Sequence, residues 1–270
     1  MILGEMRKKS GGLNFPKMSG VLMAFLGLCL LGNRAFSGEF PDQAIGFYSQ
    51  GSLRHPTPLP DQGPGFLHLF LPRHRGYGSE GMIEILKKAA LELALRFPRG
   101  ERLQIADIAA PQGGEITMHA SHQNGLDADL VYLRKNHHEQ QPGEGEVLNE
   151  DFVLNGKLSP NFDTERNWEV LKLLVSSGRV NRFFMDPVLK ITLCHYARQK
   201  GELASGEETL RRLQPYPGHA NHFHMRLTCP AESPHCVGQK AMPEGSGCDS
   251  IRQSELDAVI DPEQASALED

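Results

Sequence analysis

The sequence predicts an α+β fold. Segments typical of helices and segments typical of strands can be recognised, but they do not alternate regularly along the chain. Regular alternation is typical of a doubly wound parallel sheet, whereas irregular order with varied connections favours the α+β class. The 270 residues, of which 39% are hydrophobic, suffice for one large domain with a substantial core. No internal repeat is evident.

Three segments have the signals of helices. Residues 79–97 carry apolar side chains at a spacing near 3.6 residues, and a Pro-Arg-Gly sequence follows them. Residues 168–175 form a second apolar stretch that Gly178 closes. The third segment, residues 186–199, opens with Asp-Pro, a pair suited to an N-cap and a first helical position.

Three other segments predict strands. Residues 103–109 are largely apolar and precede a glycine-rich turn. Residues 126–132 and 222–227 alternate between apolar and polar side chains, as half-buried strands do. In the last of these, the two-residue period puts His222 and His224 on one face.

The remaining segments give the expected boundaries. Residues 38–72 are rich in Gly, Pro, Ser and Gln, and predict an irregular lead-in. Residues 73–250 contain the predicted helices and strands and form the expected domain. Within it, the polar residues 136–150 predict a solvated loop, and residues 251–270 form an acidic tail.

Residues 1–37 predict a secretory signal peptide. Basic residues precede a short apolar run at 21–31, and small residues two apart end at Ser37, after which we expect cleavage. A membrane span needs about 20 apolar residues, so the mature chain should have none. Lipid attachment at Cys29 is the alternative, although Leu28 stands where a small residue is expected.

Charge and cysteine content agree with an exported protein. Residues 1–37 hold five of the 28 basic and one of the 33 acidic residues, so cleavage leaves a formal charge near −9. That balance excludes nucleic acid as a partner, because its binding needs a basic face. An even number of cysteines in an exported chain favours two disulfides, with three possible pairings, and no C-x-x-C pair indicates a cysteine zinc site. The four cysteines are Cys194, Cys229, Cys236 and Cys248.

Two segments, 119–129 and 217–224, hold five of the 12 histidines. Catalytic zinc takes three protein ligands of histidine and carboxylate type and leaves a position for water. His122, Asp129 and His224 supply such a set. Taken singly, each histidine could be structural, and the acidic residues of 126–132 could be the solvent-facing side of a strand. The combination favours a zinc site.

These segments resemble the penicillin-insensitive murein endopeptidases. That family is related to the lysostaphin-type peptidases, the D-Ala-D-Ala metallopeptidases and the hedgehog domain. The resemblance extends from about residue 73 to residue 248. Its most specific parts are His119-Ala-Ser-His-Gln-x-Gly-Leu-Asp-x-Asp129, Asp186-Pro187 with Cys194, and His219-x-x-His-x-His224-x-Arg-Leu-x-Cys-Pro230.

The resemblance implies a fold, a site and an activity. The fold is a central antiparallel sheet with flanking helices. The activity is that of a periplasmic zinc DD-endopeptidase that hydrolyses D-Ala–meso-diaminopimelate cross-links in peptidoglycan and is insensitive to penicillin. The resemblance implies zinc on His122, Asp129 and His224, with His119, His219 and His222 lining the site and His119 as a further candidate ligand, and disulfides Cys229–Cys236 and Cys194–Cys248.

Two histidines are assigned roles in catalysis. Hydrolysis by a zinc-bound water needs a base, and the intrinsic pKa of histidine suits that role. We assign His222 as the base, and His219 to stabilising the oxyanion or orienting His222. Some family members are described with a second metal, but the matching stretch, 155–158, has neither the Asp nor the His ligand.

Two other functions fit the same metal set. One is a D-Ala-D-Ala carboxypeptidase or dipeptidase, although Asn221 stands where the dipeptidases have a glutamate base. The other is a non-catalytic, zinc-containing binding domain of the hedgehog type. The sequence does not predict an oligomeric state.

Overall fold

The computed structural model of the protein describes residues 43–249, 251 and 255. The predicted signal peptide and most of the acidic tail lie outside the described residues.

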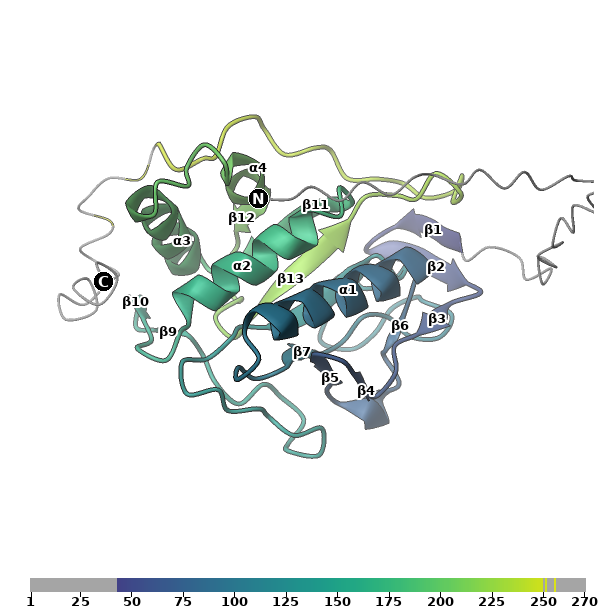
Figure 1. Cartoon of the computed structure of the whole chain (residues 1–270). Helices are drawn as coiled ribbons and strands as arrows, with labels where there is room; N and C mark the ends of the chain where they lie inside the picture. Colours follow the sequence, from purple (N-terminus) through teal and green to yellow (C-terminus); the bar gives the residue numbers. More distant parts are fainter. Residues whose placement is uncertain (1–42, 250, 252–254, 256–270) are drawn as a thin grey trace, which may run out of the picture. The chain divides into compact units, whose positions relative to one another are not determined.

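A seven-stranded sheet forms the centre of the fold (Figure 1). Two neighbouring pairs, β11–β12 and β5–β7, are parallel and the other pairs are antiparallel, so the α+β class is confirmed and the sheet is mixed. In spatial order the strands are β12 (Leu213–Pro215), β11 (Val180–Met185), β13 (His222–Leu227), β8 (Asp127–Val131), β7 (Leu103–Ile105), β5 (Phe66–His68) and β4 (Gln62–Gly63).

Much of the expected irregular lead-in is strand. β1 (Gln43–Phe47) and β2 (Gln50–Arg54) form a hairpin, and β5 pairs with β7 through Phe66 and Leu103. The expectation for the described part of 38–72 was therefore wrong, because strand pairing, local between β1 and β2 and long-range between β5 and β7, overrides its turn-rich composition. The other short pairs are β3 (Thr57–Pro58) with β6 (Tyr77–Gly78) and β9 (Val153–Leu154) with β10 (Lys157–Leu158).

Side chains that accept hydrogen bonds from backbone N–H groups begin the three longer helices. Ser79 accepts from the Met82 N–H, and Asp186 accepts from the Val188 N–H, as its Asp-Pro sequence predicts. None of the helices in the described range has the length and apolar character needed to span a bilayer. The helices are α1 (Glu80–Arg96), α2 (Thr164–Val175), α3 (Pro187–Gln199) and α4 (Glu207–Arg212), with a short 3₁₀ helix η1 (Leu71–Arg73).

The helices cover one face of the central strands and leave the other face for the site. In Figure 1, α1 and α2 lie side by side across β13. Phe223 and Met225 of β13 and Ala128 and Leu130 of β8 are fully buried in the core that these helices share. Because neighbouring side chains of a strand point to opposite faces, the alternate residues of β8 and β13 lie on the face away from this core.

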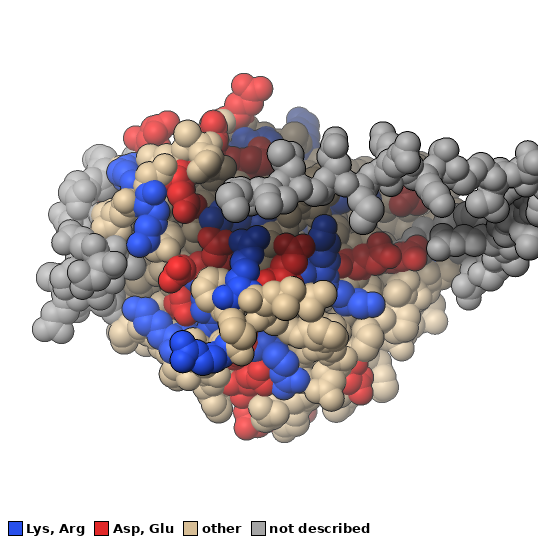
Figure 2. All heavy atoms as spheres, in the orientation of Figure 1, with Lys and Arg blue, Asp and Glu red and all other residues tan. Residues whose placement is uncertain are grey.

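Both disulfides are present, and they have the pairing that the resemblance implies. Cys194 is bonded to Cys248 and Cys229 to Cys236. On the face seen in Figure 2, basic and acidic side chains are interspersed rather than gathered into one basic patch.

Candidate metal centre

Two neighbouring strands align the acidic and histidine side chains of the site. In the register of β8 with β13, His224 is opposite Asp129 and Arg226 is opposite Asp127. His222, two residues before His224, lies on the same face. The site is therefore built on the central part of the sheet.

The loop before β8 brings in His122. Its backbone is left-handed, with φ 67°, and its N–H donates to Asp127 Oδ2 at 3.1 Å. Gly125 follows with φ 74°, and a side chain there would collide with Leu53. Ile108 O accepts from His122 Nδ1 at 2.7 Å, so that Nε2 is directed into the site.

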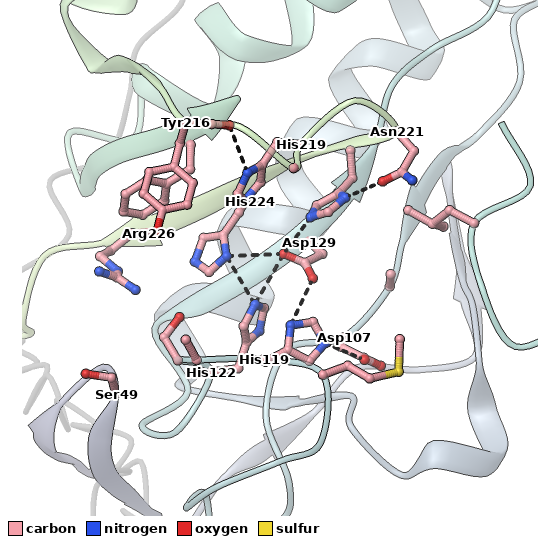
Figure 3. Close-up of a pocket in the computed structure, with 18 of the residues that line it drawn as sticks. Ser49, Asp107, His119, His122, Asp129, Tyr216, His219, Asn221, His224 and Arg226 are labelled. Carbon is pink, nitrogen blue, oxygen red and sulfur yellow. Dashed lines mark hydrogen bonds and ion pairs between the residues drawn. The ribbon is translucent and has the colours of Figure 1, made fainter. Parts of the chain in front are cut away.

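Three potential ligand atoms converge in the site (Figure 3). His122 Nε2 lies 3.2 Å from Asp129 Oδ1 and 3.2 Å from His224 Nδ1, and His224 Nδ1 lies 3.4 Å from the same carboxylate oxygen. The three side chains are buried. The structure thus brings the predicted ligands His122, Asp129 and His224 together.

The chemistry of this set fits a cation. Asp129 Oδ1 is buried and has no well-aligned hydrogen-bond donor among the described residues. Burial alone would lower the pKa of His122, but the Asp129 carboxylate, with Asp127 and the Ile108 carbonyl, outweighs burial and raises that pKa to about 9. Burial likewise opposes ionisation of Asp129, yet His122 and His222 hold its pKa well below the usual range. The carboxylate therefore attracts positive charge, which a metal ion can supply.

Asp127 corrects one sequence interpretation. It could have been on the solvent-facing side of its strand, but its exposed fraction is 0%. Arg226 donates to both of its oxygens, from Nε at 2.7 Å and from Nη2 at 3.0 Å. His224 Nε2 lies 3.0 Å from Asp127 Oδ1, an arrangement that directs His224 Nδ1 toward Asp129. A carboxylate on the second nitrogen is a common partner of metal-binding histidines.

His119 approaches Asp129 from the other side. Its Nδ1 lies 3.6 Å from Asp129 Oδ2, and its Nε2 bonds Asp107 Oδ2 at 2.9 Å. His119, His122 and Asp129 each bring one ligand atom within 4.8 Å of the others, so His119 can also hold a metal. Sequence reasoning missed Asp107, whose only local signal is an acidic residue inside an apolar run.

His222 and His219 border the ligands. His222 Nε2 is 3.6 Å from Asp129 Oδ1, while its Nδ1 is 2.6 Å from Asn221 Oδ1. Burial lowers the pKa of His222 to about 4 against the opposing effect of Asp129, so the imidazole is neutral near pH 7. The His219 ring lies 5.0 Å from that of His222, and its Nδ1 is 3.2 Å from Tyr216 O.

These side chains open onto a cavity of about 640 Å³. The predicted site histidines and Asp129 all line it, and none of the other seven histidines of the chain does. The lining also contains residues to which the sequence assigned no role in the site. Phe70, Arg73 and Asp107 come from segments outside the two motifs, whereas Asn221 and Arg226 lie within the second motif.

Comparisons with known proteins identify the family of the chain. The family model of the penicillin-insensitive murein endopeptidases matches residues 44–269. The penicillin-insensitive murein endopeptidase of Haemophilus influenzae is 34% identical over 214 residues, which cover 76% of this chain and 70% of that protein. That of Yersinia enterocolitica is 30% identical over 228 residues, covering 83% and 78%. That of Klebsiella pneumoniae is 30% identical over 217 residues, covering 78% and 76%. Because the family model and these relatives cover most of the sequence, the chain belongs to the penicillin-insensitive murein endopeptidase family.

Proposed function

We propose that this chain is a periplasmic zinc endopeptidase that hydrolyses D-Ala–meso-diaminopimelate cross-links in peptidoglycan. The observation that carries the proposal is the convergence of His122 Nε2, His224 Nδ1 and Asp129 Oδ1 at mutual distances of 3.2–3.4 Å. Tetrahedral zinc with bonds of about 2.0–2.1 Å separates its ligand atoms by about 3.3 Å. The set therefore has the composition and the spacing that zinc requires.

Zinc bound to these ligands would lower the pKa of a water molecule toward neutrality and polarise the scissile carbonyl. The proton of the attacking water then needs an acceptor. His222 fits this role because its Nδ1 faces the Asn221 amide oxygen, which leaves Nε2 as the acceptor near Asp129. The same nitrogen can return the proton to the leaving amine.

His219 is assigned to the developing negative charge. Its ring lies 5.0 Å from that of His222 and 6.2 Å from that of His224, so it borders the space in which the carbonyl oxygen becomes negative. From there it stabilises the oxyanion or orients His222.

This mechanism uses no serine nucleophile. Ser49 and Ser121 line the cavity, but within the described part of the chain no hydrogen bond joins either of them to a histidine. A β-lactam that acylates an activated serine should therefore not inhibit the protein.

Digestion of isolated murein tests the proposal. The mature protein should convert cross-linked dimers to monomers, a chelator should stop the reaction, and zinc should restore it. The His235→Ala variant, which changes an exposed histidine outside the cavity, should retain activity. Release of free D-Ala without loss of dimers would identify a carboxypeptidase instead, and zinc binding without any cleavage would identify a binding domain.

The proposed compartment has its own test. Two disulfides favour an oxidising compartment, and residues 1–37 have the pattern of a secretory signal. We expect the mature protein in the periplasmic fraction with its N-terminus near Gly38. An intact N-terminus in the cytoplasmic fraction would contradict this localisation.

A further inference from the structure

We propose that Arg73 binds a carboxylate of the peptide substrate. This inference rests on the proposed function, because cross-linked murein peptides carry free carboxylates. One of them lies on the diaminopimelate carbon attached to the scissile nitrogen. A guanidinium is suited to such a group because its planar fork donates two parallel hydrogen bonds.

The charges around Asp107 leave a surplus of positive charge at this wall of the cavity. Asp107 Oδ2 accepts from Arg73 Nη1 at 2.8 Å and from Arg75 Nη1 at 3.0 Å, and it also contacts His119. One buried carboxylate thus faces two guanidinium groups. The side of this cluster that faces the cavity attracts an anion.

Arg73 is the member of the cluster with free donors. Arg75 uses Nη1 and Nη2 on Thr117 as well as on Asp107, and it does not line the cavity. Arg73 does line the cavity, its side chain is 18% exposed, and no hydrogen bond to its Nε or Nη2 occurs within the described residues. These two nitrogens can receive a carboxylate.

The Phe70 ring and the local backbone conformation orient the Arg73 side chain. Its guanidinium carbon lies 4.0 Å from the centre of the Phe70 ring, a cation–π contact that orients the plane of the fork. Phe70 and His74, which flank the short helix η1, both have left-handed backbones with φ 54° and 53°. Such conformations cost energy in residues other than glycine and often occur at ligand sites.

The other arginine of the cavity has no comparable capacity. Arg226 donates from Nε and Nη2 to Asp127 and from Nη1 to Gln239 at 2.7 Å. Its hydrogen-bonding groups are engaged by neighbouring side chains. Of the two cavity arginines, Arg73 is therefore the one that can bind a substrate carboxylate.

The test compares cross-linked muropeptides with this carboxylate free or amidated, using the zinc-loaded mature protein. The parent should prefer the free acid by about 10- to 100-fold in kcat/KM, because a charge-assisted pair is lost on amidation. Arg73→Gln should lose this preference mainly through KM, and Arg73→Lys should keep part of it. Arg75→Gln is the matched control, since it removes a donor from Asp107 but no cation from the cavity, and it should keep the preference.

Zinc content and thermal unfolding, measured for each variant, separate a lost contact from a lost fold. A parent that cleaves neither peptide overturns the proposed function and this inference with it. A parent that cleaves both peptides equally, or an Arg73→Gln variant that keeps the parental preference, overturns the inference alone. If the preference instead follows amidation of the D-glutamate carboxylate and disappears in Arg73→Gln, Arg73 binds that carboxylate.

Discussion

Three of the imidazoles that face Asp129 each have a different group beside the second ring nitrogen, and the fourth, His119, has Asp107 there. The Ile108 carbonyl contacts His122, the Asp127 carboxylate lies beside His224, and the Asn221 amide oxygen contacts His222. These partners decide which nitrogen of each ring faces the site. Two histidines that share one strand face can therefore have different roles.

Replacing His222 and His224 separately tests this division of roles. His224→Ala should lose both metal and activity, because a proposed metal ligand is removed. His222→Ala should keep near-normal metal content and lose about 10²- to 10⁴-fold in rate, the usual contribution of a general base. Metal analysis and muropeptide kinetics measure both effects. If His222→Ala loses zinc while His224→Ala retains it, the two roles are reversed.

Asp127→Asn should weaken metal binding although Asp127 is not a proposed ligand. The change removes the charge beside His224, and loss of such a partner commonly costs about 10- to 100-fold in metal affinity. It also leaves Arg226 without its ion pair, so the free energy of unfolding should fall by about 3–5 kcal/mol. Competition with a chelator and chemical denaturation measure the two quantities.

Glu101→Gln provides the control for Asp127→Asn. Glu101 is a buried carboxylate paired with Arg166, and it does not line the cavity. This variant should lose stability without losing metal affinity. Equal metal affinity in Asp127→Asn and the parent would show that Asp127 does not contribute to metal binding.

At the scale of elements, the segments predicted best are those with one clear local signal in the sequence. The helical period and the Asp-Pro start predicted α1 and α3 almost to the residue, and the alternation of residues 222–227 predicted β13. β11 escaped prediction because nearly all of its residues are buried, so Val180–Met185 show no alternation. β5 escaped prediction because the distant strand β7, rather than its own composition, stabilises it, and β4 is a two-residue strand that pairs with β5.

The site residues likewise divide into those that a local sequence signal predicts and those that it does not. The convergence of His122, Asp129 and His224 could be predicted because candidate metal ligands are limited to a few residue types and the two motifs contain them. Arg73 and Asp107 carry no local signal, since their significance comes from contacts between segments 34 residues apart. The burial of Asp127 depends on pairing across the sheet with Arg226, 99 residues later. Such contacts can be read only from the folded chain.

The two disulfides should contribute unequally to stability. Cys194–Cys248 spans 54 residues and Cys229–Cys236 spans seven. Since the entropy removed from the unfolded chain grows with loop length, paired alanine replacements should cost about 4 kcal/mol for the long loop and about 2 kcal/mol for the short one. Chemical denaturation of the two double variants measures this difference. A larger loss for the seven-residue loop would show that local packing, not loop entropy, decides their contributions.

At the scale of the whole molecule, Lys190 should make stability depend on pH. It is buried, and its Nζ donates to Leu210 O at 2.5 Å and to Ser246 O at 2.7 Å, which joins α3 to α4 and to the C-terminal segment. Burial lowers its pKa to about 8. An unfolded lysine titrates near 10.4, so between about pH 8 and pH 10 the unfolded state binds more protons than the folded state. The free energy of unfolding therefore gains up to about 1.4 kcal/mol per pH unit from this group as pH rises.

Denaturation of the parent and of Lys190→Met from pH 7 to pH 10 measures this gain as a rise in the stability of the parent relative to that of the variant. Lys88→Met is the control, because the Lys88 side chain is 77% exposed and its difference from the parent should stay constant. Parallel curves for the parent and Lys190→Met would contradict the prediction.

The register between β8 and β13 is determined by which side chains are buried in the apolar core. A slip of one residue would turn Phe223 and Met225 toward the cavity and drive His222 and His224 into the apolar core. Exposing the two apolar side chains to water and burying the two histidines in the apolar core would both cost free energy. Burial of the apolar face therefore favours the correct pairing without a metal ion. The pairing of β8 with β13 thus does not depend on a bound metal ion. A metal ion can therefore bind to a site that is already assembled and is not needed to assemble it.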